Sequence, residues 1–194
     1  MVIAIDGPAG AGKSTVARAV AARLGFTYLD TGAMYRAVGL AGTPECDIAF
    51  DAEGRVLLDG RDVSAEIRSA EASEAASRVA ADPAVRAVLV AKQRALLAQG
   101  DWVAEGRDIA LVVAPDAEVK VFLTADPVER ARRRAADLGA DPDVVLQEQT
   151  LRDERDQASG DRTVASPAPG ATGLDTTGLD FDAVVDRIAE LAAR

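Results

Sequence analysis

Histidine is absent from this chain of 194 residues, and cysteine occurs once, at Cys46. The absence of histidine excludes Ser–His triads, His-based general bases and most transition-metal sites. A single cysteine forms no internal disulfide, and nothing in the sequence indicates an oxidising compartment. These two counts exclude several classes of hydrolase and metalloprotein.

Long apolar runs are also missing, although 48% of the residues are hydrophobic. No run approaches the ~20 residues of a membrane span. The apolar residues 2–5 are followed at once by Asp6, and this stretch has neither the length nor the flanks of a signal peptide. We expect a cytoplasmic protein that folds as one domain over residues 1–194 and does not enter a membrane.

Lysine is scarce, because the 22 basic residues include only Lys13, Lys92 and Lys120. Most basic residues are therefore arginines, and any single arginine is weak evidence for a functional site. The net charge of −10 argues against a nucleic-acid-binding surface, which needs a basic face. An acidic protein can still hold a small anion in a local basic pocket.

Short apolar runs alternate with helical patterns along the chain. Strands are expected at residues 2–5, 26–29, 102–104 and 119–123, and helices at 14–24, after Asp126-Pro127 and after Asp180. Such alternation predicts an α/β fold with a mostly parallel sheet. Residues 55–63, with Asp59-Gly60 at the turn, predict a β-hairpin inside an insert at about 40–100. A polar region rich in Arg, Asp, Pro and Gly predicts a lid at about 130–165.

One stretch carries the strongest functional signal. Residues 7–14 match the phosphate-binding pattern G-x-x-x-x-G-K-[ST] in full, after a predicted strand and before a predicted helix. Main-chain N–H groups and the helix N-terminus would cradle phosphates, Lys13 would bridge the β- and γ-phosphates, and Ser14 would bind Mg²⁺. The predicted ATP-binding residues are Gly7, Pro8, Ala9, Gly10, Ala11, Gly12, Lys13, Ser14 and Thr15.

A carboxylate at a neighbouring strand end should complete the Mg²⁺ site. Glu105 is the favoured candidate, acting through water because Mg²⁺ retains several waters. Asp6 and Asp30 also follow predicted strands and compete for this role.

The P-loop indicates that a nucleoside triphosphate binds, but it does not indicate which molecule accepts the phosphoryl group. An alcohol acceptor usually needs a base, whereas a phosphate acceptor is already an anion at neutral pH. Arginines would both position and neutralise such an acceptor through bidentate bonds. The absence of histidine therefore favours a phosphate acceptor.

Three further motifs resemble one family. The segments 6–15 (DGPAGAGKST), 29–36 (LDTGAMYR) and 105–108 (EGRD), in this order with the hairpin between the last two, are similar to the bacterial cytidylate kinases. The similarity runs from Val2 to the last predicted helix. It implies a P-loop nucleoside-monophosphate kinase with a three-layer fold, a monophosphate-binding insert and a helical lid, which transfers phosphate from ATP to CMP and dCMP with Mg²⁺.

The resemblance also implies roles for matching residues. Thr31, Arg36 and Arg86 would hold the acceptor phosphate, and Ser77, Arg107 and Asp108 would surround the cytosine. A carboxylate beside an arginine suits cytosine, whose N4 donates where uracil has an acceptor. Family membership further implies a monomer whose partners are its small-molecule substrates.

The lid matches the family pattern in two registers. One register places Arg152 and Asp156 at the ribose, and the other uses Arg155 and Arg162, which we favour together with Arg133 for stabilising the transferred phosphoryl group. The segment 41–55 is shorter than is usual in the family, and a helix is expected to be missing there. Two alternatives remain at this stage: a P-loop kinase of another acceptor such as UMP or a metabolite, and a nucleotide-dependent switch protein.

Overall fold

The computed structural model describes residues 1–51, 54–158 and 167–193. The described chain forms two compact units, residues 1–29 with 100–194 and residues 30–99. Each unit is considered separately below.

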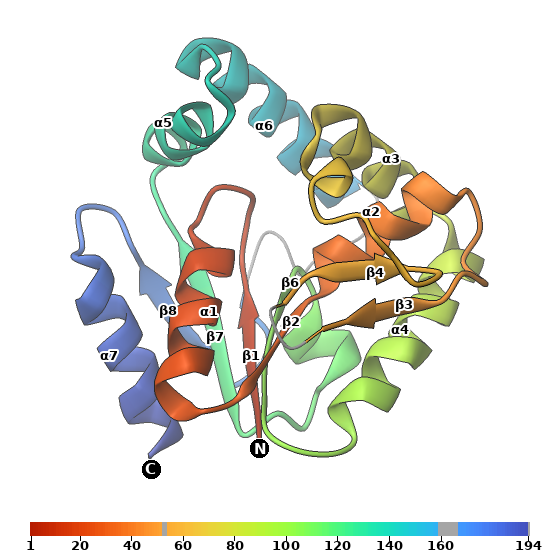
Figure 1. Ribbon diagram of the computed structural model, residues 1–194. Coiled ribbons are helices and arrows are strands. Elements are labelled where there is room, and N and C mark those ends of the chain that lie inside the picture. The colour runs from red at the N-terminus through yellow and green to blue at the C-terminus, as the bar shows by residue number, and fades with distance from the viewer. Residues whose placement is uncertain (52–53, 159–166, 194) are drawn as a thin grey trace. The chain divides into compact units, whose positions relative to one another are not determined.

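The first unit is built on a five-stranded sheet, in the order β2-β6-β1-β7-β8 (Figure 1). Its strands are β1 Val2–Asp6, β2 Thr27–Asp30, β6 Trp102–Gly106, β7 Val119–Thr124 and β8 Thr172–Asp175. Strand β1 pairs in parallel with β6 and β7, and β7 pairs in parallel with β8. The predicted α/β class with a parallel sheet is confirmed.

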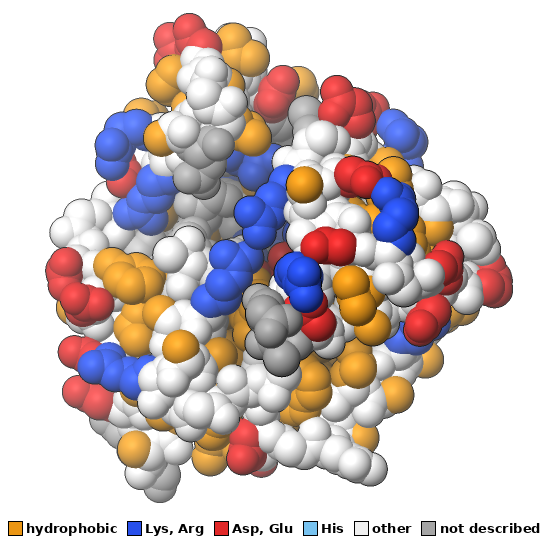
Figure 2. Space-filling model, viewed as in Figure 1, with side chains coloured by type: hydrophobic (Ala, Val, Ile, Leu, Met, Phe, Trp, Pro, Cys, Tyr) orange, Lys and Arg blue, Asp and Glu red, His pale blue; other side chains and the backbone are white. Residues whose placement is uncertain are grey.

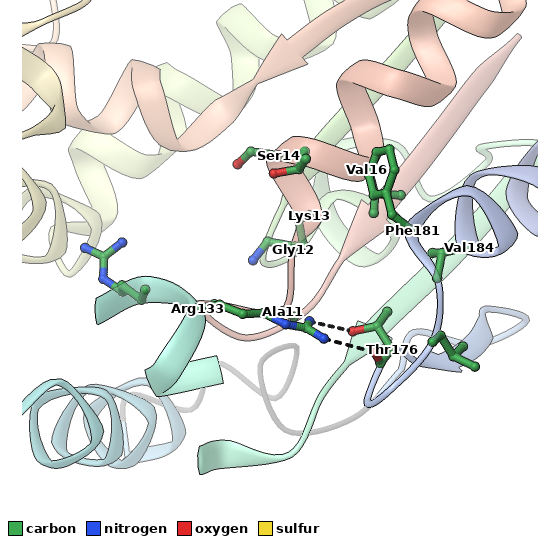
Figure 3. A pocket seen from close by; sticks show the side chains of 13 residues that line it. Ala11, Gly12, Lys13, Ser14, Val16, Arg133, Thr176, Phe181 and Val184 are labelled. Atoms are coloured by element: carbon green, nitrogen blue, oxygen red, sulfur yellow. Dashed lines mark hydrogen bonds between the residues drawn. The ribbon is translucent and has the colours of Figure 1, made fainter. Parts of the chain in front are cut away.

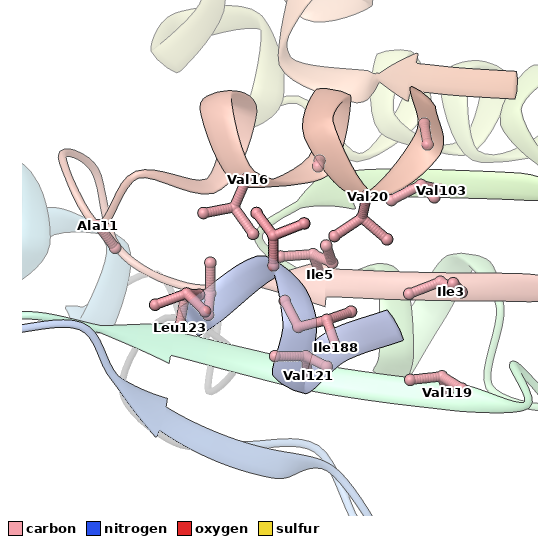
Figure 4. Packing of buried hydrophobic residues seen from close by; sticks show 14 residues of the cluster. Ile3, Ile5, Ala11, Val16, Val20, Val103, Val119, Val121, Leu123 and Ile188 are labelled. Carbon is pink, nitrogen blue, oxygen red and sulfur yellow. The ribbon is translucent and has the colours of Figure 1, made fainter. Parts of the chain in front are cut away.

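Two helices cover one face of this sheet, α1 Lys13–Leu24 and α7 Phe181–Ala192. Ile3 and Ile5 of β1 pack with Val20 of α1 and Ile188 of α7 in a buried cluster (Figure 4). Successive strand residues face opposite sides, so Ala4 and Asp6 point to the other face, where a wide helical turn, Ile109–Val113, packs on β1. Burial of this apolar face, at about 25 cal/mol per Å² of apolar surface, holds β1 at the centre of the sheet.

The ends of several helices follow the local rules that the sequence obeys. Gly25 ends α1 in the left-handed conformation at φ 70°. Helix α5 Pro127–Leu138 begins where Asp126 accepts hydrogen bonds from the backbone N–H groups of Val128 and Glu129. The predicted starts of α1, α5 and α7 are confirmed.

The second unit contains three helices and a small sheet within its described residues. Its elements are α2 Thr31–Ala41, β3 Ile48–Phe50, β4 Val56–Leu58, β5 Arg61–Asp62, the turn Glu66–Arg68, α3 Ala70–Ala80 and α4 Pro83–Leu97. The predicted hairpin is β4–β5, with Asp59 and Gly60 both at positive φ in its turn. Lys92 donates hydrogen bonds to the carbonyl oxygens of Pro44 and Cys46 and so fixes the loop after α2.

Several elements depart from the sequence expectation. Helix α2, strands β3 and β8 and the 109–113 turn were not expected. Residues 142–158 were read from their composition as a lid or loop and, by the family resemblance, as part of a helical lid; they form the continuous helix α6 Pro142–Ala158. Helix α6 packs against α5 through a small apolar cluster of Ala131, Ala135 and Val145. Within the described residues, no helix is long and apolar enough to cross a membrane.

Candidate active site

The glycine-rich loop joins the central strand β1 to helix α1. Two of its glycines are required by close approach: a Cβ on Gly7 would lie 2.1 Å from the Leu123 carbonyl oxygen, and one on Gly10, at φ +76°, would lie 2.8 Å from the Arg130 carbonyl oxygen. Helix α1 starts at Lys13 and leaves its first N–H groups at the loop. The loop and helix end therefore form an anion-binding cradle.

A pocket of about 460 Å³ opens beside this loop (Figure 3). Its walls combine P-loop residues with groups from α5 and from the segment before α7. It is lined by Gly10, Ala11, Gly12, Lys13, Ser14, Thr15, Val16, Arg133, Arg134, Thr176, Leu179, Phe181 and Val184. Lys13 Nζ donates to the Pro8 carbonyl oxygen at 2.8 Å, which keeps the amino group at the loop.

The arginines of α5 have different partners. Arg132 and Arg133 both donate to Glu129, and they lower the pKa of its carboxyl to about 2. Arg133 also donates to Thr176, to Oγ1 at 3.1 Å and to the carbonyl oxygen at 3.0 Å (Figure 3). Arg134 lines the pocket and forms no ion pair with a described residue. The predicted residue Arg133 therefore lies in the pocket wall, where Glu129 and Thr176 hold its guanidinium.

Arg130 connects the lid helices to the P-loop. Its guanidinium is buried and donates to the Ala9 carbonyl oxygen at 2.9 Å and to Asp153 of α6 at 3.0 Å. Sequence reasoning missed this role, because an arginine in an arginine-rich helix carries no signal of its own. The contact fixes α5 and α6 against the outer side of the phosphate cradle.

The candidate metal ligands can be compared by their hydrogen bonds. Glu105 is buried on β6 and accepts a hydrogen bond from the Tyr28 hydroxyl of β2. Asp6 uses both carboxylate oxygens to accept the N–H groups of Ile109 and Ala110, each at 2.8 Å. Asp30 caps α2 through Ala33 and pairs with Arg36. All three carboxylates accept hydrogen bonds, so these contacts do not decide between them, and Glu105 stays the candidate that the sequence favours.

The residues present fit Mg²⁺, a hard cation that prefers oxygen ligands. The Ser14 hydroxyl stands at the start of α1 in the pocket wall, and Glu105 supplies a carboxylate. The described residues contain no cluster of three or more potential metal-binding side chains. The remaining ligands would therefore come from phosphate oxygens and water, as is usual for Mg²⁺ bound with a nucleotide.

Arg107 and Asp108 follow β6 at the same edge of the sheet as the P-loop. In the pairing of the two strands, Asp6 lies opposite Gly106, so both loops leave adjacent parallel strands at their carboxyl ends. Ligands of parallel sheets bind at this edge. Asp108 is 8% exposed, and its charge together with burial raises the pKa of Asp6, burial being the larger cause, to about 6.

The second unit carries the other predicted acceptor residues. Thr31 and Arg36 lie on α2, Ser77 on α3, which packs against α2, and Arg86 on α4. Arg36 pairs with Asp30 at 2.9 Å, while its Nε is buried without a hydrogen-bond partner among the described residues. Ser77 donates to the Ser73 carbonyl oxygen one turn earlier. Arg36 thus keeps bonding capacity for an anion.

The lid residues are described only in part. Arg152, Arg155 and Asp156 belong to α6, but their side chains lie outside the described part of the structure. Arg162 lies outside the described residues altogether. Both lid registers therefore stay predictions.

Basic groups are accessible on this acidic molecule. Figure 2 shows Lys and Arg side chains among Asp and Glu side chains on the visible face. A net charge of −10 is therefore compatible with local sites for anions.

Comparison with known proteins identifies the family. The family model described as cytidylate kinase matches residues 3–194. The chain belongs to the cytidylate kinase family. It is 50% identical over 193 residues to a cytidylate kinase of Cereibacter sphaeroides, covering 97% of this chain and 93% of that protein. It is 48% identical over 210 residues to a cytidylate kinase of Pelotomaculum thermopropionicum, covering 96% and 93%.

Solved structures support the fold. A gluconokinase from Sinorhizobium meliloti superposes with a TM-score of 0.59 at 19% identity, covering 99% of this chain and 91% of that one. The resemblance read from the three motifs is therefore confirmed, and this cytidylate kinase family member is a phosphotransferase of the nucleoside-monophosphate kinase type that uses ATP as phosphoryl donor.

Proposed function

We propose that this kinase transfers the γ-phosphoryl group of ATP to CMP and dCMP. The observation that carries the proposal is the pairing of β1 with β6, which brings the P-loop and the Arg107–Asp108 segment to one edge of the sheet. The donor and the acceptor base are then bound by loops that leave neighbouring strands.

The donor side is formed by the P-loop and the pocket beside it. Main-chain N–H groups of the P-loop hold the phosphates, and Lys13 compensates their charge. The apolar side chains of Val16, Phe181 and Val184 give the pocket a wall against which the base of ATP packs. Ser14 and Glu105 would hold Mg²⁺, which would supply charge neutralisation for the phosphates when bound.

The acceptor side is divided between phosphate and base. Thr31, Arg36 and Arg86 bind the monophosphate, and Arg107, Asp108 and Ser77 bind cytosine. The Asp108 carboxylate accepts from the cytosine N4 amino group, whereas uracil would place an oxygen against it. Discrimination against UMP follows from this unpaired acceptor.

Catalysis requires positioning and charge compensation more than proton abstraction. The acceptor phosphate is an anion at neutral pH, so the reaction needs no histidine to act as a general base. Lys13, Arg133 and Arg134 provide cationic groups around the phosphates, joined by Arg155 and Arg162 in one lid register. In the other register, Arg152 and Asp156 contact the ribose. Helices α5 and α6 act as the lid that excludes water during transfer.

The cellular setting and the oligomeric state of the enzyme form a separate proposal. We propose that it acts as a monomer in the cytoplasm and binds no nucleic acid, because its net charge is −10 and its single cysteine indicates no oxidising compartment. Light scattering at the concentration used for assays tests the monomer, and a dimer mass would contradict it.

An acceptor panel tests the proposed activity. ADP release from Mg-ATP is measured with CMP, dCMP, UMP, AMP or GMP in separate reactions, with a control lacking acceptor. The proposal predicts fast release with CMP and dCMP and little with the others. Equal rates with UMP would contradict the role of Asp108, and no stimulation by any monophosphate would contradict the function.

A further inference from the structure

Asp6 lies at the junction between the donor and acceptor loops. It is the last residue of β1, directly before the P-loop, and is 3% exposed. Both of its carboxylate oxygens accept backbone N–H groups of the 109–113 turn, from Ile109 and Ala110. The P-loop strand is thereby bonded to the segment that follows Arg107 and Asp108.

The 109–113 turn has an unusual cap. The residue before a helical turn normally caps it, and Asp is among the preferred residues at that position. Asp108 occupies this position, yet its side chain makes no cap hydrogen bond to the turn. Asp6, remote in sequence, accepts the first N–H groups of the turn instead.

This arrangement has a consequence for Asp108. A carboxylate that caps its own turn folds back on the backbone, and its oxygens are then directed at N–H groups two and three residues ahead. Asp6 already accepts the N–H group of Ala110, which lies two residues ahead of Asp108, and so replaces Asp108 in that part of the cap. The proximity of the two acidic groups, evident in the mutual influence of their charges, further disfavours Asp108 turning toward the same N–H groups.

We propose that Asp6 is a positioning residue for acceptor recognition: by capping the 109–113 turn it holds the Asp108 carboxylate in the orientation that reads cytosine. This inference rests on the proposed function and adds to it a residue that touches neither substrate. Without Asp6, the unsatisfied N–H group of Ala110 would recruit Asp108 as its cap, and the base-reading carboxylate would be lost.

The test is Asp6→Asn, which keeps the shape of the side chain but leaves one amide N–H facing a backbone N–H. We expect the KM for CMP to rise about tenfold and the preference for CMP over UMP to fall about tenfold, as for loss of one charge-assisted hydrogen bond. The KM for Mg-ATP stays within about twofold, because the P-loop backbone is not altered. Equal rises in both KM values, or an unchanged preference, would overturn the proposal.

A stability control separates positioning from simple loosening of the fold. Val121 is fully buried in β7 of the same sheet, and Val121→Ala removes core packing without touching the 109–113 turn. We expect this variant to lose stability while it keeps the wild-type preference for CMP over UMP. If Val121→Ala lost the preference as much as Asp6→Asn, the effect would belong to general stability and the proposal would fail.

A double-mutant cycle tests whether Asp6 acts through Asp108. In an Asp108→Asn background, Asp6→Asn should change the CMP preference by less than about twofold, because the group it positions is already altered. Additive effects would overturn the mechanism. If Asp6→Asn does not fold, Asp6→Ser, whose hydroxyl is one small acceptor, replaces it in the same test. If neither variant folds, Asp6 contributes to stability alone and the proposal fails. Absence of CMP phosphorylation by the wild-type protein would instead refute the proposed function.

Discussion

At the residue scale, the account depends first on Lys13. Its Nζ already lies at the P-loop, bonded to the Pro8 carbonyl oxygen. We predict that Lys13→Ala lowers kcat by about a hundredfold or more, since a cation that compensates transition-state charge is lost. The melting temperature should change little.

Lys120 offers a matched control for this variant. Its amino group also donates to a carbonyl oxygen five residues earlier, that of Pro115, but it lies away from the pocket lining. Lys120→Ala should retain wild-type kcat. Comparable losses in the two variants would contradict the assignment of Lys13 to the phosphates.

The three consecutive arginines of α5 allow a second comparison. Arg132 is exposed and paired with Glu129, whereas Arg134 lines the pocket without an ionic partner among the described residues. We predict that Arg134→Ala raises the KM for Mg-ATP about tenfold, whereas Arg132→Ala leaves it within about twofold. Steady-state kinetics at saturating CMP measure both, and the reverse order would exclude a phosphate contact for Arg134.

The pKa of Asp6 predicts a pH dependence of stability. Burial is the main cause that raises this pKa from 3.8 to about 6 in the folded protein, so the unfolded chain binds fewer protons between these values. The contribution of Asp6 to the free energy of unfolding should therefore fall as pH rises from about 4 to about 6, and stay constant above. Urea unfolding of wild type and Asp6→Asn across this pH range measures the contribution of Asp6. If the free energy of unfolding of wild type minus that of Asp6→Asn increased with pH, the raised pKa would be contradicted.

At the scale of elements, helix α6 buries a polar side chain, Gln149, beside the apolar Val145. Gln149 is 4% exposed and lies against Gly10 of the P-loop, and its amide N and O have no hydrogen-bond partner among the described residues. A buried unsatisfied amide costs about 1–3 kcal/mol. We predict that Gln149→Leu increases the free energy of unfolding by about 1 kcal/mol.

The exposed neighbour Gln147 provides the control on the same helix. Gln147→Leu should leave the free energy of unfolding within about 0.5 kcal/mol, as for most surface substitutions. Urea denaturation of both variants at one pH decides between them. A destabilised Gln149→Leu would mean that its amide is satisfied in solution.

The elements that could be predicted were those with local signals. Helix α1 ends at Gly25, α5 starts at Asp126-Pro127, α7 starts after Asp180, and the β4–β5 hairpin has Asp59-Gly60 at its turn. Strand β8 contains Gly173 and, among the described residues, pairs with β7 at the sheet edge. The 109–113 turn depends on the remote carboxylate of Asp6. Contacts between residues that are far apart in the chain produce no local sequence pattern, so these two elements could not be predicted.

At the scale of the whole molecule, the predicted site residues fall in two units. The P-loop, Glu105 and Asp108 belong to the first, and Thr31, Arg36 and Ser77 to the second. The strand, loop and helix that carry the donor motif could be predicted, because that motif is contiguous in the sequence. Capping of the turn beyond Asp108 by Asp6 and the anchoring of Arg133 to Thr176 could not be predicted, because they depend on tertiary contacts between distant segments.

The central claim is that phosphate passes from ATP to the cytidine monophosphate and not to water. The most direct measurement is to incubate the protein with γ-³²P-labelled ATP, Mg²⁺ and CMP, and to separate the products by chromatography. The account predicts label in CDP in proportion to the ADP formed. Label released as inorganic phosphate, with CMP recovered unchanged, would contradict it.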